Sequence, residues 1–214
     1  SSTIDDLRSA IAVVAALRPP QPGQLTDAEA ALYTQLSEQL GRHADVLRVA
    51  AAADLAARSR RELGSQSLAR RHSVQSAAQL VEKFARVSAS EAARRVRLAA
   101  DIAPRVALTG EILPARFDAV AVAFRAGDIG MDASLTIART LAPAERTAAI
   151  GALQAAERDL VDQAREVSAD LVSIEARAWR AALDPDGAEP RDAELRARRR
   201  LVIGRTRDDG MTPF

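Results

Sequence analysis

Three polar residues that suit contact with DNA recur at helical spacing between residues 89 and 103. Ser90, Arg94 and Arg97 are separated by four and three positions, so they share one face of a helix. The planar guanidinium of arginine can bind O6 and N7 of a guanine together, or clamp a phosphate. Arg95 flanks this face, and we expect it to enter a DNA groove beside Arg94 and Arg97. The pattern therefore predicts a surface for duplex DNA.

A second set of arginines precedes this helix. Residues 58–105 carry 11 basic and 4 acidic residues, a net charge of +7, in a chain whose formal net charge is +1. We expect the leading arginines to position DNA through its phosphates; they are Arg58, Arg60, Arg61, Arg70 and Arg71. The alternative is a solvated face that is neutralised by residues 106–190, which carry 8 basic and 14 acidic residues.

Two predicted helices, at 76–85 and 89–103, position these side chains. Apolar residues recur on one face of each helix, and they are Ala77, Leu80, Val81 and Phe84, then Ala92, Val96, Ala99 and Ala103. Ser88 and Glu91 form a capping box that begins the second helix. Two helices joined by a short turn are typical of a helix-turn-helix unit. An alanine-rich helical protein also contains such pairs for packing alone, so this alternative stays open.

The composition favours helices throughout. The chain has 48 alanines and only 3% aromatic residues, so its core is built from side chains suited to close helix packing. We predict a predominantly α fold: a multi-helix bundle with a long spine helix, an internal helix-turn-helix-like pair and a short C-terminal β-hairpin. The spine helix is expected at 27–63, with an apolar stripe that includes Leu32, Leu36, Leu40, His43, Leu47 and Ala50. We expect this helix either to be packed by several other helices or to pair with a second chain.

The remaining elements follow from turn and capping signals. Helices are expected at 3–17, 114–127, 132–141, 143–167, 168–184 and 190–200, loops at 64–73 and 104–114, and a truncated hairpin at 201–214. We divide the chain into a helical domain, 1–187, and a segment, 188–214, that contains the basic helix and the hairpin. The chain does not begin with Met, and we expect it to be part of a longer protein.

Few residues suit catalysis or metal binding. The chain has no cysteine, which excludes thiolate sites and disulfides. We expect His43 to be packed on the spine helix and His72 to contact solvent or phosphate. Asp159, Asp162 and Glu166 share a helical face and could bind a hard cation, but interspersed arginines favour a solvated ion-pair face.

The chain shows no export or membrane signal. No uncharged apolar run approaches the roughly 20 residues that a membrane helix needs. The first residues include Asp5 and Asp6, where a signal or transit peptide would be basic. We therefore expect a cytoplasmic protein without a membrane partner.

Four segments resemble the N-terminal region of the actinobacterial domain of unknown function 222, the 13E12-repeat family. They are 58–81, RSRRELGSQSLARRHSVQSAAQLV; 89–99, ASEAARRVRLA; 109–129, TGEILPARFDAVAVAFRAGDI; and 178–211, which begins AWRAALDPDG. The resemblance covers the chain from about residue 25 onward. It implies a parent protein in which a smaller domain, often an HNH endonuclease, follows. The chain has no asparagine, so it contains no His-Asn-His motif.

The residues and the resemblance together predict a non-catalytic module that targets an HNH endonuclease-like protein to duplex DNA. No cofactor is expected here, since a divalent metal belongs only with the nuclease domain. The resemblance carries no catalytic residue into this region. The alternative is a dimerisation or protein-interaction module that pairs through the helix at 27–63 without contacting DNA.

Overall fold

The computed structural model describes residues 2–107 and 109–184. The chain separates into two compact units, residues 1–41 and 42–214. The described part is mostly helical, with one two-stranded antiparallel sheet, which confirms the predicted fold class. The predicted basic helix at 190–200, the hairpin at 201–214 and the domain boundary at 187 lie outside the described residues. None of the described helices combines the length and hydrophobicity required to span a bilayer.

The first unit contains α1 (Ser2–Ala16) and the start of α2 (Asp27–Ala57). Helix α1 ends at Ala16, within one residue of the predicted end at 17 and before Pro19 and Pro20, which cannot continue a helix. A capping box begins α2: the N–H of Glu29 donates to Thr26 Oγ1 at 3.4 Å, and the N–H of Thr26 donates to Glu29 Oε2 at 2.9 Å. Hydrogen bonds from the backbone N–H and the hydroxyl of Thr26 to the Glu29 carboxylate lower the pKa of that carboxyl. No residue of α1 is buried.

The spine helix exists but differs from the prediction in its length and its packing. It ends at Ala57 rather than near residue 63, because residues 58–62 are all polar and give a continued helix nothing to bury. The leucines of the predicted stripe are 43–56% exposed, and they are Leu32, Leu36, Leu40 and Leu47. Val49 and Ala52 are instead the buried residues of α2.

The segment predicted as a loop at 64–73 contains helical turns. A 3₁₀ helix, η1 (Arg61–Gln66), is followed by the short α3 (Leu68–Arg71). Gly64 has a φ of 53° inside η1, so it marks a kink there and does not end α2. Helical turns of three to six residues lack the periodicity that would reveal them in the sequence.

The predicted helix pair is confirmed as α4 (Ala77–Ala85) and α5 (Ala89–Ile102). The Ser76 hydroxyl accepts the N–H of Gln79 at the start of α4, and the Ser88 hydroxyl accepts the N–H of Glu91 at the start of α5. Arg86 ends α4 in the left-handed conformation, with a φ of 54°. The chain's only lysine, Lys83, donates from Nζ to the carbonyl oxygen of His72 at 3.3 Å. A turn of three residues thus joins two packed helices.

A β-hairpin replaces the loop predicted at 104–114. Strands β1 (Pro104–Val106) and β2 (Ile112–Ala115) pair antiparallel, with Arg105 opposite Leu113 and Val106 opposite Ile112. Pro114 lies within β2 and does not open a helix. Strands of three and four residues show too little alternation for a prediction from sequence.

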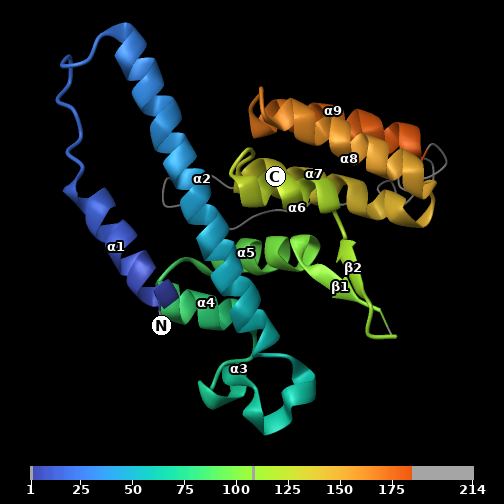
Figure 1. The fold of residues 1–214 in the computed structure, drawn as a ribbon. Helices are drawn as coiled ribbons and strands as arrows, with labels where there is room; N and C mark the ends of the chain where they lie inside the picture. Colours follow the sequence, from blue (N-terminus) through green and yellow to red (C-terminus); the bar gives the residue numbers. More distant parts are fainter. Residues whose placement is uncertain (1, 108, 185–214) are drawn as a thin grey trace, which may run out of the picture. The chain divides into compact units, whose positions relative to one another are not determined.

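Four helices and a 3₁₀ turn form most of the core of the second unit (Figure 1). They are α6 (Asp118–Ala126), α7 (Met131–Leu141), η2 (Ala142–Arg146), α8 (Ile150–Ala164) and α9 (Ala169–Leu183). The helix predicted at 143–167 is therefore divided into η2 and α8. Helices α7, α8 and α9 pack against one another. Fully buried side chains hold them together, including Phe117, Phe124, Ile137, Leu141, Leu160 and Val172.

Candidate nucleic-acid interface

The outward face of α5 carries three of the predicted contact residues. Ser90 and Arg97 are exposed, and the side chain of Arg94 is 42% exposed. The opposite face packs into the protein through Ala92, Leu98, Ala99 and Ile102. The predicted spacing therefore places Ser90, Arg94 and Arg97 together on the accessible side of the second helix of the pair.

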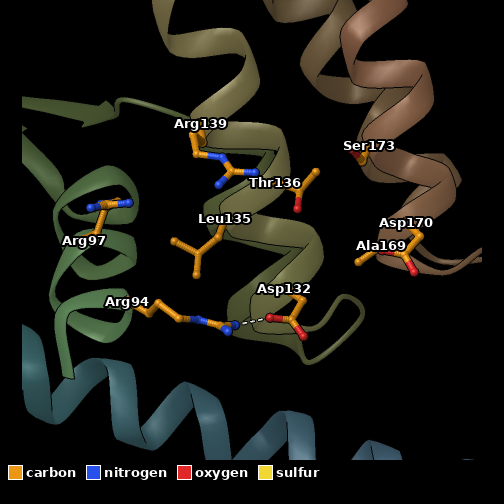
Figure 2. A pocket seen from close by; sticks show the side chains of 9 residues that line it. All are labelled: Arg94, Arg97, Asp132, Leu135, Thr136, Arg139, Ala169, Asp170 and Ser173. Atoms are coloured by element: carbon orange, nitrogen blue, oxygen red, sulfur yellow. Dashed lines mark hydrogen bonds and ion pairs between the residues drawn. The ribbon is translucent and has the colours of Figure 1, made fainter. Parts of the chain in front are cut away.

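Beside this face, a cavity of about 360 Å³ opens between α5, α7 and α9 (Figure 2). We call it the α5–α7–α9 cavity; it is lined by Arg94, Arg97, Asp132, Leu135, Thr136, Arg139, Ala169, Asp170 and Ser173. Two of its basic side chains come from α5 and one from α7. Arg139, Thr136 and Ser173 were not identified from the sequence, because helical periodicity does not reveal which neighbouring helix a surface residue faces.

Arg94 is paired within the protein. Its Nη2 donates to Oδ1 of Asp132, the second residue of α7. Its Nε lies 3.8 Å from Oε2 of Glu91, beyond hydrogen-bond distance, and is buried without a hydrogen-bond partner among the described residues. Asp132 belongs to the acidic segment 106–190. Its carboxylate thus neutralises one of the arginines that the sequence analysis expected to contact DNA.

The other two arginines of the cavity are not paired in this way. Within residues 2–107 and 109–184, Arg97 and Arg139 form no ion pair or side-chain hydrogen bond, and both are exposed. Their positive charges are available to an external anion.

Arg95 does not lie where the sequence analysis placed it. The residue is 8% exposed, and its Nε donates to Oε1 of Glu91 at 2.9 Å. It belongs to the inner face of α5, a half-turn from the face that carries Arg97. The burial of Arg95 therefore gives no support to its predicted contact with a DNA groove beside Arg94.

Two of the arginines before the helix pair, Arg61 and Arg70, line a second cavity. A hollow of about 500 Å³, the η1–α3 cavity, is lined by Ser59, Arg61, Ser67, Ala69, Arg70, Val74 and Gln75. The hydroxyl of Ser59 is buried there without a hydrogen-bond partner in the described part of the chain. This cavity shares no lining residue with the α5–α7–α9 cavity. Members of the two predicted sets therefore line two distinct hollows, Arg61 and Arg70 in one and Arg94 and Arg97 in the other.

The remaining arginines of that set face solvent. Arg58 donates to Asp54 Oδ2 at 2.7 Å, and this hydrogen bond raises the pKa of the Arg58 guanidinium. Arg60 Nε donates to the carbonyl oxygen of Ala57 at 3.1 Å, and Arg71 is exposed. Arg58 and Arg60 are therefore held against the end of α2.

A family model described as "Domain of unknown function (DUF222)" matches residues 25–214. The chain belongs to the DUF222 family. The match includes the helix pair and the residues that line both cavities, so the candidate interface lies within the DUF222 region.

Curated relatives with sequence similarity to this DUF222 chain come from mycobacteria. Two uncharacterised proteins of Mycobacterium tuberculosis, MT1160 and Rv1128c, are each 38% identical over 128 residues, which is 59% of this chain and 30% and 28% of theirs. An uncharacterised protein of Mycobacterium bovis, Mb1179c, is 33% identical over 126 residues, 59% of this chain and 28% of its own. The chain thus spans under a third of the length of these relatives. No solved structure matches it.

The two histidines of the DUF222 chain have packing contacts. The ring of His72 meets the ring of Phe84 edge to face, with centroids 4.9 Å apart. His43 is exposed, contrary to its predicted packing, but its ring lies against Gly127. Arg42 also contacts Gly127: its Nε donates to the carbonyl oxygen of Gly127 at 2.8 Å.

The acidic face of α8 is used for contacts within the DUF222 chain. Asp159 Oδ2 accepts the indole N–H of Trp179 at 2.7 Å, and Asp162 pairs with Arg165 at 2.6 Å. In the described ranges, no group of three or more acidic or histidine side chains is arranged to hold a metal ion.

Proposed function

We propose that this chain is a helical module that binds duplex DNA through the α4–α5 pair and performs no catalysis itself. The observation that carries the proposal is the geometry of the pair: two packed helices, a three-residue turn with Arg86 in the left-handed conformation, and Ser90 and Arg97 exposed on the second helix. A helix-turn-helix presents the N-terminal part of its second helix to the major groove.

The charge around the pair supports the same function. Arg97, Arg139, Arg70 and Arg71 are exposed and add positive charge near α4 and α5. Contacts of arginine with phosphates position a protein on DNA, while side chains on the second helix read bases. We therefore assign base contact to Ser90, and phosphate contact to Arg70, Arg71 and Arg97. Arg94 also contacts a phosphate when its ion pair with Asp132 breaks.

In this proposal the chain is one module of a longer protein that carries an additional activity. Because the chain covers under a third of its mycobacterial relatives, a longer protein can carry an activity that this module directs to DNA. The family resemblance implies an HNH endonuclease there. The module then raises the local concentration of DNA at that domain, whose divalent metal would do the cleavage chemistry.

A titration of fluorescently labelled duplex with the 214-residue chain tests the proposal. We expect saturable binding whose affinity falls steeply between low and moderate salt, since several phosphates are neutralised. Arg97→Ala and the double variant Arg70→Ala/Arg71→Ala should each weaken it. Arg146→Ala is the matched control, because Arg146 is exposed and unpaired among the described residues and lines neither cavity. Absence of binding at low salt, in a folded chain, would refute the function.

A second candidate function is homodimerisation through the spine helix. Tyr33, Leu36, Leu40, His43 and Leu47 follow one another at alternating spacings of three and four, the heptad seam of a coiled coil. All five are exposed, and of them His43 also contacts Gly127 of its own chain; α1 adds further exposed apolar residues, including Ile4, Leu7 and Ile11. Exposed apolar side chains in such a row favour a partner helix with the same pattern.

Measurement of the solution mass decides between the two candidates. If the spine helix forms a dimer, Leu36→Asp and Leu47→Asp should produce monomers, and Gln35→Asp, an exposed neighbour outside the seam, should not. Loss of the dimer in a chain that never binds duplex would favour assembly over DNA binding. A wild-type chain that is monomeric at high concentration would remove the second candidate.

A further inference from the structure

The α5–α7–α9 cavity brings together donors that have no acceptor within the described residues. Arg97 on α5 and Arg139 on α7 line it without an ion pair, and the half-buried hydroxyls of Thr136 and Ser173 line it from α7 and α9. The buried Nε of Arg94 also lacks a hydrogen-bond partner in the part of the chain that the structure describes. A buried donor without an acceptor costs free energy, so a ligand that supplies an acceptor here is favoured.

The charges of the cavity suit one compact anion. Its lining contains three arginines and two aspartates, and Asp132 is already paired with Arg94. Asp170 is exposed and is the other carboxylate that faces an incoming anion. Arg97 and Arg139 therefore outweigh Asp170. Two guanidinium groups with nearby hydroxyls are typical of phosphate recognition, because each arginine offers two parallel N–H donors.

We propose that the α5–α7–α9 cavity is a phosphate-binding site, in which Arg97 and Arg139 bind the oxygens and Thr136 and Ser173 donate hydroxyl hydrogen bonds. This inference rests on the proposed DNA-binding function, and the phosphate it commits to is a phosphodiester of the DNA backbone next to the groove that α5 enters. It adds α7 and α9 to the interface, beyond the helix pair that the sequence identified.

Asp132 has a defined part in this proposal. Its carboxylate holds Arg94 and repels a phosphate at the same end of the cavity (Figure 2). Asp132→Asn removes one negative charge with little change of shape and releases Arg94. We therefore expect Asp132→Asn to bind duplex more tightly than the wild type, by about threefold to tenfold, and Asp170→Asn to have a smaller effect in the same direction.

Arg139 gives the sharpest test, because it lies outside the helix pair and is exposed, so its removal leaves the fold intact. We expect Arg139→Ala to weaken duplex binding by about tenfold. It should also lower the slope of log affinity against log salt by about one, as the loss of one phosphate contact does. Arg139→Lys should recover part of the affinity, since lysine restores the charge without the planar fork. Arg146→Ala should match the wild type.

A second arm uses inorganic phosphate without DNA. Phosphate at millimolar concentration should raise the midpoint of thermal unfolding of the wild type more than that of Arg139→Ala, with chloride at equal ionic strength as the control. A shift in the wild type alone, together with no duplex binding, would show a site for free phosphate and would refute the DNA function.

The remaining outcomes overturn the inference. If duplex binds the wild type, Arg139→Ala and Arg146→Ala with equal affinity and equal salt slope, the phosphate site is refuted while DNA binding stands. If the chain binds neither duplex nor phosphate, both proposals fail. Circular dichroism of each variant confirms that the comparison is between folded chains.

Discussion

Glu157 on α8 accepts the backbone N–H of Val120 on α6, at 2.9 Å from Oε1. The N-cap residue of α6, Phe117, has no side-chain oxygen to do this. A carboxylate 37 positions along the chain therefore satisfies one of the free N–H groups at the start of α6. The residue is only 5% exposed, so the contact joins two helices in the core.

The first prediction concerns the pH dependence of stability. Burial raises the pKa of Glu157 above its ordinary value of 4.5, because desolvation of the carboxylate outweighs the hydrogen bonds from Val120 and Ala119. Between pH 4.5 and the raised pKa, the folded chain keeps a proton that the unfolded chain has lost. The contribution of Glu157 to the free energy of unfolding therefore falls as pH rises through this window.

Glu157→Gln removes this titration and keeps an oxygen that accepts the Val120 N–H. We expect the variant to gain stability relative to the wild type as pH rises from 4.5. Urea unfolding at a series of pH values measures this difference. A difference that stays constant across the series would contradict the raised pKa.

The second prediction concerns Gly127, which ends α6 in the left-handed conformation with a φ of 76°. A Cβ added there would lie 2.7 Å from Cε1 of His43, and a side chain at this φ is itself strained. We expect Gly127→Ala to lower the free energy of unfolding by about 2 kcal/mol or more. Thermal or urea unfolding of the wild type and the variant measures this difference in the free energy of unfolding.

A His43→Ala background separates the two causes of that loss. In this background the steric contact disappears and the backbone strain remains, so Gly127→Ala should cost less there but still about 1 kcal/mol. Equal costs in both backgrounds would show that the contact with His43 has no effect.

The third prediction follows from the burial of Arg95. Arg95→Met should lower the stability by roughly 1–3 kcal/mol, because it leaves Glu91 without its hydrogen bond. The same variant should bind duplex like the wild type when folded, whereas the exposed Arg97→Ala should keep its stability within about 0.5 kcal/mol and lose affinity. Unfolding curves and duplex titrations of both variants check this. The opposite pattern would return Arg95 to the interface.

The fourth prediction concerns Arg116, which connects α5 to η2. Its Nη1 donates to Asp101 at 3.0 Å, and its Nε donates to both oxygens of Glu145 at 2.9 Å. The hydrogen bond to Glu145 raises the pKa of the guanidinium, against the effect of partial burial.

We expect Arg116→Ala to cost about 0.5–1 kcal/mol, since the side chain is 36% exposed and solvent screens the pairs. The cost should shrink at high salt. Arg146→Ala, which lacks such partners among the described residues, should cost less than Arg116→Ala in the same unfolding experiment. Equal costs would mean that the bridge contributes nothing.

The helix pair could be predicted from sequence because its signals are local. Ser88 and Glu91 are three residues apart, and the capping hydrogen bond between them forms within one turn. The end of α2 could not be predicted in this way. The polar residues 58–62 are of types that also occur in exposed helices, so they do not by themselves mark an end, and whether a neighbouring element covers them depends on distant parts of the chain. The hairpin of β1 and β2 escaped prediction because it is short.

The candidate site could be predicted only on the helix that carries its pattern. Ser90, Arg94 and Arg97 share a face by periodicity, but the same periodicity does not show that Asp132 pairs with Arg94. The pairing joins residues 38 positions apart. Arg95 was misplaced because its charge suggested solvent exposure, while its position on the helix is that of a core residue. The sequence did not predict that Arg139 belongs to the site, because only the packing of α7 against α5 brings this residue to the cavity.

The single lysine on α4 offers a practical consequence. Because Lys83 is the only lysine of the chain, amine-selective reagents modify one side chain besides the terminal amine, and before labelling that side chain reaches the carbonyl oxygen of His72. A fluorophore attached there sits on the first helix of the pair, with no engineered cysteine required. Quenching of that dye by a labelled oligonucleotide would report the approach of the duplex in real time.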